Sequence, residues 1–248
     1  MLPKVHIVDR YFLAAKKLQV ENDFIGVNCG IMDQFAVAMG KKDKAIMLDC
    51  DSLQYEYIPF ETGEYCLVII NSNKQRTLVG SKYNERFSEC GAALKLLRQE
   101  LAVGSLCDVS MADFELKKHL FNDGVLEKRA LHVISENARV KDAVIALQTG
   151  DMELFGKLMY ASHQSLKDLY EVSGKELDTI VDFCKTYDGC IGARMTGAGF
   201  GGCAIALIKR NSLEDFSARL SDYYKNQIGY APEIFASTAE DGVREFRL

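Results

Sequence analysis

The chain has 248 residues, and its 48% hydrophobic and 26% charged residues are typical of a globular protein with a substantial core. Its 30 Lys and Arg residues and 35 Asp and Glu residues give a formal net charge of -5, and no basic stripe is visible, so we expect no nucleic-acid partner. The longest apolar runs are too short to cross a bilayer, so we expect no membrane-spanning segment.

The first part of the chain is expected to begin with two helices. Apolar residues at helical spacing predict a helix over residues 4–24, and the glycines and asparagine of residues 26–30 end it. A second, short helix is expected over residues 32–39, with Gly40 as the residue that ends it.

A β-hairpin is expected next, from strands over residues 45–48 and 55–58 with an Asp-Ser turn between them. After it, the apolar run of residues 66–71 is suited to a buried strand. We place a coarse domain boundary near residue 60, between the hairpin and this run.

The remaining chain alternates helical periodicity with strand-like runs. Amphipathic helices are expected over residues 80–101, 125–148, 151–170, 174–186 and 213–227. Strands are expected over residues 191–196, 203–208 and 232–237, the first two flanking a glycine-rich turn. The order strand, turn, strand, helix, strand at the back of the chain predicts an α+β sandwich with mostly antiparallel pairing.

The eight cysteines are scattered without a CxxC pair, and the four histidines do not cluster with them. This spacing is not that of a zinc site, and a disulfide framework is not expected in a chain of this length. We therefore expect most of the cysteines to be small buried hydrophobic residues and the protein to be cytoplasmic.

The glycine-rich turn, residues 197–202, satisfies the pattern GxGxxG. As a dinucleotide-binding fingerprint this pattern requires a helix after it, but an alternating, strand-like run follows here, so we reject that interpretation. Two interpretations remain: a loop whose bare backbone N–H groups bind an anion, or a wide hairpin turn packed on a helix. The candidate binding residues are Gly197, Gly199, Gly201 and Gly202, with Arg194 and Thr196 just before them.

Arg194 has a second interpretation, as a structural partner in an ion pair.

Asp33 lies in the first turn of a predicted helix, where an acid commonly stabilises the helix dipole. The same position would also project a carboxylate into a crevice, where it accepts a proton from an alcohol.

Glu21 lies at the end of the preceding predicted helix, where an acid is unfavourable unless solvent or a cation such as Mg²⁺ compensates it. Tyr83 follows a polar segment and is either a hydrogen-bonding phenol or a core ring.

Five segments, in this order, resemble those of galactokinases, which are sugar kinases of the GHMP superfamily. They are residues 21–35, residues 71–74 with 83–86, residues 129–137, residues 162–173 with 176–178, and residues 192–202. The resemblance runs from about residue 18 to the C-terminus. It implies a GHMP-kinase-like α+β fold in which residues 1–60 are a remnant of the N-terminal domain. Residues 61–248 would form a ferredoxin-like C-terminal α/β sandwich with added helices.

The resemblance also implies roles for the candidate residues. Asp33 would face the anomeric hydroxyl of the sugar as its base or electrostatic partner, and Glu21 would bind Mg²⁺. Gly30, Asp33 and Tyr83 would contact galactose, and the glycine-rich turn would lie beside the substrates. The implied reaction converts ATP and α-D-galactose into galactose 1-phosphate and ADP, which depends mainly on positioning and charge neutralisation.

Two segments typical of galactokinases have no counterpart here: an N-terminal sugar-binding segment, and a glycine-serine loop over the ATP phosphates. We therefore expect a truncated chain with little or no activity alone, and self-association through the exposed remnant of the N-terminal domain. Two alternatives stay open. One is a non-catalytic regulator that senses sugar or nucleotide on the same fold, and the other is a related GHMP kinase acting on N-acetylgalactosamine, arabinose or mevalonate.

Overall fold

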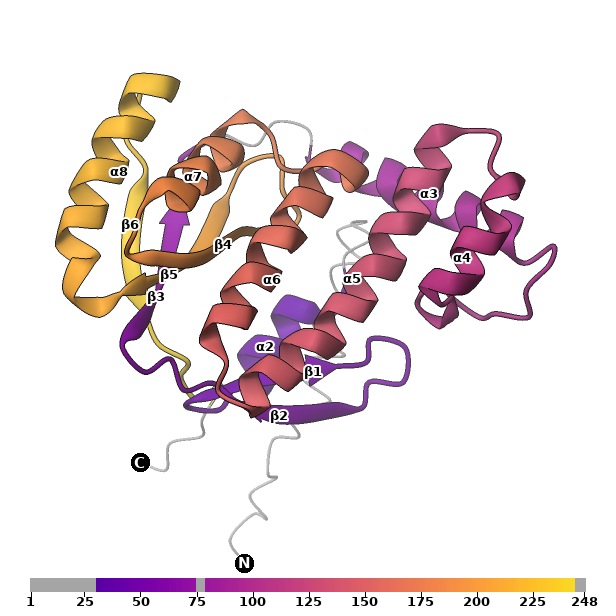
Figure 1. The fold of residues 1–248 in the computed structure, drawn as a ribbon, viewed down its shortest axis with the longest axis horizontal. Helices are drawn as coiled ribbons and strands as arrows, with labels where there is room; N and C mark the ends of the chain where they lie inside the picture. Colours follow the sequence, from indigo (N-terminus) through magenta and orange to yellow (C-terminus); the bar gives the residue numbers. More distant parts are fainter. Residues whose placement is uncertain (1–29, 75–78, 244–248) are drawn as a thin grey trace, which may run out of the picture. The chain divides into compact units, whose positions relative to one another are not determined.

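The computed structural model describes residues 30–74 and 79–243 (Figure 1). These residues form two compact units, one from residues 30–61 and 238–243 and the other from residues 62–237. The expected helix over residues 4–24 and the break at 26–29 lie outside the described residues. The identity of the parts as a domain remnant and a C-terminal domain stays a prediction.

The smaller unit contains the predicted short helix and hairpin. Helix α2 spans Met32–Met39, and strands β1 (Lys44–Leu48) and β2 (Tyr55–Pro59) pair antiparallel. Ile31, Phe35 and Ala38 are buried and pack against apolar residues of β1. The chain returns to this unit near its end, where the Gly242 N–H donates to the Gly40 carbonyl at 2.8 Å.

The larger unit is built on a four-stranded sheet in the order β4-β5-β3-β6. The strands are β3 (Tyr65–Asn71), β4 (Cys190–Thr196), β5 (Cys203–Lys209) and β6 (Glu233–Ser237). All three pairings are antiparallel, with β3 between β5 and β6. This order and the helices between the strands make the ferredoxin-like sandwich that the sequence predicts, and the α+β class is confirmed.

Helices α7 (Lys175–Thr186) and α8 (Leu213–Ile228) cover one face of this sheet. Alternate strand residues such as Val68, Ile70 and Ala204 point to that face and are fully buried with the apolar faces of both helices. The period of two in the strands and the period near 3.6 in the helices therefore meet in one core.

The added helices form a second core beside the sandwich. Helices α3 (Val79–Leu97), α4 (Met111–Lys117) and α5 (Gly124–Gln148) pack around residues such as Leu97, Phe114 and Ala130. Short 3₁₀ turns at Leu106–Asp108, Lys118–Leu120 and Arg210–Ser212 complete the irregular connections. Helix α6 (Met152–Ser165) lies between α5 and the sheet, alongside β4 (Figure 1).

Three features differ from the sequence-based expectation. Helix α3 ends at Leu97 rather than at residue 101, because the N–H groups of Gln99 and Glu100 bond to carbonyls three residues back in a turn. The single helix expected over residues 151–170 is α6 followed by a π-helical turn, Leu166–Tyr170. Helix α4 was not predicted, although Ser110 accepts a hydrogen bond from the Asp113 N–H, a regular N-cap signal.

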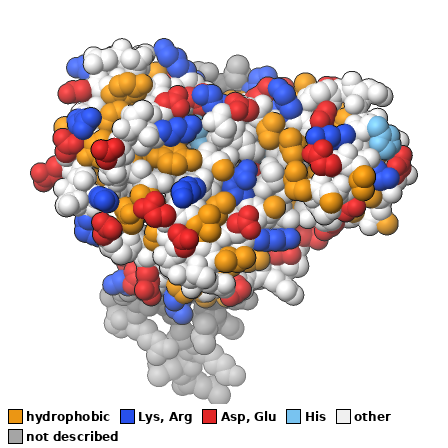
Figure 2. All heavy atoms as spheres, in the orientation of Figure 1, with side chains coloured by type: hydrophobic (Ala, Val, Ile, Leu, Met, Phe, Trp, Pro, Cys, Tyr) orange, Lys and Arg blue, Asp and Glu red, His pale blue; other side chains and the backbone are white. Residues whose placement is uncertain are grey.

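Acidic and basic side chains are interspersed over the face of the molecule in Figure 2. Among the helices of the described residues, none combines the length and the apolar composition that a membrane crossing requires.

Helix α6 approaches β4 through two glycines. A Cβ on Gly156 would lie 2.2 Å from the Ile191 carbonyl oxygen, and a Cβ on Gly192 would lie 2.4 Å from the Gly156 Cα. Neither position leaves room for any side chain, so this close approach of α6 to β4 requires glycine at both positions.

We predict that Gly156→Ala lowers the free energy of unfolding by about 1–3 kcal/mol, because the added methyl group must push α6 away from β4. Urea unfolding measures the change. Gly91→Ala is the matched control: it also lies in a helix, its added Cβ meets nothing within 4 Å, and it is expected to stabilise the protein slightly. Equal effects of the two substitutions would contradict the prediction.

Candidate functional site

The glycine-rich turn joins β4 directly to β5, so no helix begins behind it. Its four glycines have a positive φ, which glycine adopts without strain: φ is 75° at Gly197, 82° at Gly199, 116° at Gly201 and 80° at Gly202. The dinucleotide-binding interpretation is therefore excluded, and a bare-backbone loop between two strands remains.

Two neighbouring segments determine the path of this turn. The Phe200 N–H donates to the Val172 carbonyl at 2.7 Å, and the Ser72 N–H donates to the Gly202 carbonyl at 2.8 Å. A Cβ on Gly199 would lie 2.1 Å from the Val172 carbonyl oxygen. The turn therefore packs backbone against backbone, a contact that only glycine allows.

A lysine that was not among the predicted site residues lies against the turn. A Cβ on Gly201 would be 3.1 Å from the aliphatic carbons of Lys74, whose Nζ forms an ion pair with Glu176 Oε2 at 2.8 Å. The sequence signal was present, because Lys74 ends the polar segment of residues 71–74 that follows β3. The ion pair places one cation and one carboxylate beside the glycine turn.

Strand β4 is anchored immediately before the turn by a buried histidine. The Met195 N–H donates to His163 Nδ1 at 3.2 Å, so the ring proton is on Nε2, which lies 3.3 Å from Asp178 Oδ1. Lys167 Nζ is 3.3 Å from the other oxygen of the Asp178 carboxylate. Burial opposes ionisation of Asp178, but hydrogen bonds from His163 and Ser173 and the charge of Lys167 lower its pKa overall.

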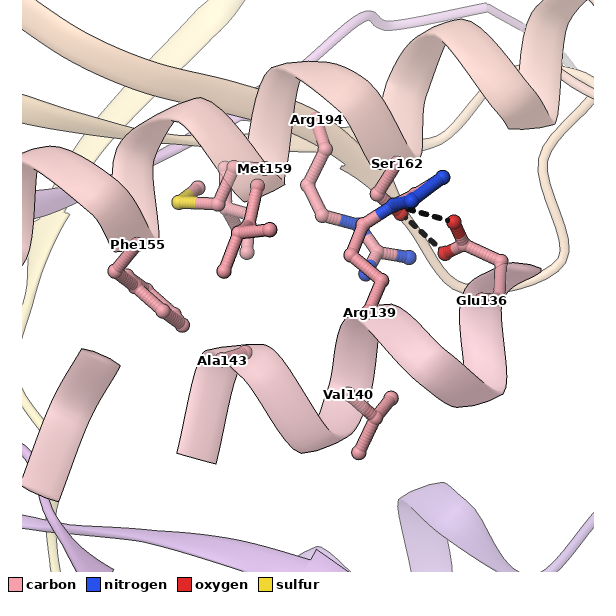
Figure 3. Close-up of a pocket in the computed structure, with 10 residues that line it drawn as sticks. Glu136, Arg139, Val140, Ala143, Phe155, Met159, Ser162 and Arg194 are labelled. Atoms are coloured by element: carbon pink, nitrogen blue, oxygen red, sulfur yellow. Dashed lines mark hydrogen bonds and ion pairs between the residues drawn. The ribbon is translucent and has the colours of Figure 1, made fainter. Parts of the chain in front are cut away.

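Arg194 lines a cavity of about 140 Å³ between α5, α6 and the sheet (Figure 3). Glu136 in this cavity already has two partners: its Oε1 forms an ion pair with Arg139 Nε at 2.9 Å, and its Oε2 accepts a hydrogen bond from Ser162 Oγ at 2.5 Å. Arg194 Nε donates to the Met195 carbonyl at 3.1 Å, and burial lowers the pKa of Arg194. The predicted role of Arg194 and Thr196 at the glycine turn stays a prediction.

The other predicted residues fall in different places. Gly30 and Asp33 belong to the smaller unit, where Asp33 is exposed in the first turn of α2 and Gly30 is exposed just before that helix. Tyr83 lies half-buried on α3. It belongs to the larger unit, which also contains the glycine turn, Arg194 and Thr196. Glu21 lies outside the described residues.

His132 on α5 is a buried neutral base in the larger unit. Its ring stacks on Tyr170 with the centroids 4.3 Å apart, and its Nδ1 lies 2.8 Å from Ser165 Oγ. Burial, followed by the charges of Arg139, Arg194 and Arg129, lowers the pKa of His132 from its ordinary 6.5 to about 3. Protonation of this ring therefore opposes folding.

Comparison with known families agrees with this fold. Residues 143–226 match the family of GHMP kinase C-terminal domains. This match covers α6, the π turn, α7, the glycine turn and most of α8. Those residues are thus similar to GHMP kinase C-terminal domains.

Among proteins of that class the chain is similar to galactokinases, and the resemblance found in the sequence is thereby confirmed. It is 51% identical to the galactokinase of Clostridium tetani over 96% of this chain and 61% of the relative, and 49% identical to that of Staphylococcus carnosus over 97% and 62%. The chain thus spans about three fifths of the length of these relatives.

Solved structures agree with this placement. The crystal structure of Lactococcus lactis galactokinase complexed with galactose superposes with a TM-score of 0.92 at 45% identity, over 95% of this chain and 61% of that one. The L. major mevalonate kinase in complex with R-mevalonate superposes with a TM-score of 0.59 at 20% identity, over 96% of this chain and 60% of that one, which shows the shared fold alone.

We predict that Gly199→Ala displaces the glycine turn and lowers the free energy of unfolding by about 2–4 kcal/mol, from the clash with Val172 together with the positive φ. Gly197→Ala is the matched control, since its φ is also positive but its Cβ would meet nothing within 4 Å, so it bears only the backbone strain of about 1–2 kcal/mol. Chemical denaturation of both variants measures the difference, and equal losses would show that the Val172 contact is unimportant.

We predict that the free energy of unfolding falls as the pH drops from 6.5 toward 3, with His132 contributing about 1.4 kcal/mol per pH unit. The sign follows because the unfolded state binds a proton near the ordinary pKa while the folded state does not, so the stability is complete above pH 6.5. Urea unfolding between pH 4.5 and 7 measures the slope, which His132→Asn should reduce. The exposed His119→Asn should keep it, and an unchanged slope in His132→Asn would refute the assignment.

Proposed function

We propose that this chain belongs to the catalytic machinery of a galactokinase, which transfers the γ-phosphoryl group of ATP to galactose. The observation that carries the proposal is the similarity to the galactose-complexed Lactococcus lactis galactokinase, at 45% identity and a TM-score of 0.92 over 95% of this chain. The related kinase structure at 20% identity supports the fold and says nothing of the sugar.

In the proposed reaction the C1 hydroxyl oxygen of galactose attacks the γ-phosphorus of ATP. The bond from that phosphorus to the β–γ bridging oxygen breaks, ADP leaves, and the hydroxyl proton passes to the Asp33 carboxylate or is stabilised by it. Asp33 suits this role because it is an exposed carboxylate on a helix that Ile31 and Phe35 anchor in a buried core. Mg²⁺, with Glu21 as its predicted ligand, would neutralise phosphate charge.

The larger unit would position the substrates. Backbone N–H groups of the glycine turn would approach the phosphates or the sugar closely, since Gly197, Gly199, Gly201 and Gly202 carry no side chains. Tyr83 would hydrogen-bond to galactose, and Arg194 and Thr196 would act on the nucleotide side. Correct orientation of the acceptor and donor supplies much of the rate in phosphoryl transfer.

The setting proposed for this reaction is the cytoplasm, and the described cysteines, all of them free, suit a reducing compartment. The sequence has no counterpart of the sugar-binding segment or of the glycine-serine phosphate loop of galactokinases. We therefore propose that the chain alone phosphorylates galactose slowly or not at all. We also propose that it self-associates through the smaller unit.

The decisive measurement is ADP release with ATP, Mg²⁺ and galactose. It is made on this chain alone and on a chimera in which the chain replaces the matching residues of Clostridium tetani galactokinase. We predict that the chimera is active on galactose and that Asp33→Asn lowers its kcat at least about 100-fold through loss of the carboxylate. Asp51→Asn, an exposed acid in the hairpin turn of the same unit, should change kcat less than about twofold.

A sugar panel of galactose, N-acetylgalactosamine, arabinose and mevalonate completes the test. Preference of the chimera for another acceptor, or full activity of its Asp33→Asn variant, would refute the proposed function. Galactose binding by this chain without turnover, together with an inactive chimera, would instead indicate a sugar-sensing regulator.

A further inference from the structure

Four charged residues form a cluster between α3, α5 and the end of the π turn. We call Arg86, Glu89, Arg129 and Glu171 the arginine–glutamate cluster. Arg86 and Glu89 lie on α3, Arg129 lies on α5, and Glu171 follows the π turn in a left-handed conformation with φ of 57°. None of these residues has a role in the function proposed above.

Arg129 is the centre of this cluster and is only 2% exposed. Its Nε lies 2.7 Å from Glu89 Oε2, its Nη2 lies 2.7 Å from Glu171 Oε2, and its Nη1 donates to the Leu169 carbonyl at 2.5 Å. Burial alone would lower the pKa of Arg129, but the hydrogen bonds to Glu89 and Glu171 raise it overall. All three nitrogens of the guanidinium are therefore in use.

Arg86 contacts the same stretch of backbone from the other helix. Its Nε donates to the Tyr170 carbonyl at 2.7 Å, its Nη2 to the Glu171 carbonyl at 3.5 Å, and its Nη1 is 2.9 Å from Glu89 Oε2. Two guanidinium groups thus engage the carbonyls of three consecutive residues, 169–171. A segment in π and left-handed conformation leaves these carbonyls without regular helical partners.

The segment held in this way is the one on which the glycine turn rests. The next residue, Val172, accepts the Phe200 N–H at 2.7 Å, and its carbonyl is the atom that Gly199 approaches most closely. A displacement of residues 169–171 would move the Val172 carbonyl and, with it, the support of the turn.

The cluster shares a face of α3 with the predicted sugar-binding tyrosine. Tyr83 and Arg86 lie on the same side of α3 because residues three apart on a helix are neighbours. Arg86 Nε in turn donates to the Tyr170 carbonyl at 2.7 Å. Arg86 therefore links the face of α3 that carries Tyr83 to the segment that supports the glycine turn.

We propose that the arginine–glutamate cluster positions the glycine turn and fixes it relative to Tyr83, so that its arginines are positioning residues for substrate binding. The structural part of this inference stands on its own, whereas its kinetic part rests on the proposed kinase function. Arginine is required at position 129 because a lysine ammonium cannot contact Glu89, Glu171 and the Leu169 carbonyl at once.

Hydrogen exchange of the full chain, followed by mass spectrometry, tests the structural part. Arg129→Gln and Arg129→Lys should both speed amide exchange in residues 197–203 at least tenfold, while peptides from β3 and α7 exchange as in the unsubstituted protein. Arg98→Gln is the matched control, because Arg98 donates to the Val103 carbonyl at 2.9 Å in an exposed turn and should leave residues 197–203 unchanged.

Uniformly faster exchange across the chain, or unchanged exchange in residues 197–203, would overturn the inference. Recovery of slow exchange in Arg129→Lys would also overturn it, since charge alone would then suffice. If the Arg129 variants do not fold, Glu171→Gln decides instead: its side chain is 45% exposed, and the same local effect of smaller size is expected.

The kinetic part is measured on the galactokinase chimera described above. Arg129→Lys should raise the KM values for ATP and galactose together at least fivefold and change kcat less than threefold, opposite to Asp33→Asn, which should act on kcat. Unchanged KM values in an active chimera would overturn the positioning role and leave the proposed function intact. An inactive chimera would overturn the proposed function, and the exchange experiment would still decide whether the cluster holds the turn.

Discussion

The close approach of Gly199 to the Val172 carbonyl is the contact on which the candidate site of the larger unit depends. It brings together the turn between β4 and β5 and the end of the π-helical turn. These two segments are separate elements in the chain. A single Cβ at Gly199 would separate them. The turn can therefore be well defined although it has few side chains, because its backbone is fixed by two segments that are themselves buried or hydrogen-bonded.

Buried charge is used in two different ways around this contact. Arg86 and Arg129 are almost fully buried, and their nitrogens are satisfied by carboxylates and backbone carbonyls, as burial of a charge requires. Arg194 differs, because Glu136, the carboxylate that lines the same cavity, already has Arg139 and Ser162 as partners. The first arrangement holds backbone in place, whereas the second leaves a desolvated cation facing a cavity.

The regular elements could be predicted from the sequence, because each rests on a local pattern. The apolar run of β3, the alternation in β5, the periodicity of α5 and α8, and the glycines between β4 and β5 are all present within short windows. The π turn and the arginine–glutamate cluster could not be predicted in this way. Arg86, Arg129 and Glu171 are far apart in the sequence, and only packing of α3 against α5 shows that they share one site.

The candidate functional residues were predictable to different extents. The glycine turn and Asp33 were identified by their local patterns, and the structure places them on a strand connection and in a helical first turn. The contribution of Lys74 was missed, since a lysine after a strand is usually a solvated residue, and its contact with Gly201 arises from the pairing of β3 with β5. Local patterns thus indicate which backbone is special, and tertiary pairing decides which side chains accompany it.

The charge balance at the glycine turn constrains how it can act on a phosphate. Lys74 is the cation that touches the turn, but Glu176 lies 2.8 Å from its ammonium group and neutralises it. An anion at the turn must therefore either displace Glu176 or be bound chiefly by backbone N–H groups, whose partial charges are smaller. In the proposed kinase the larger unit would then supply orientation more than charge, and neutralisation of the phosphates would depend on Mg²⁺ and on groups other than the turn.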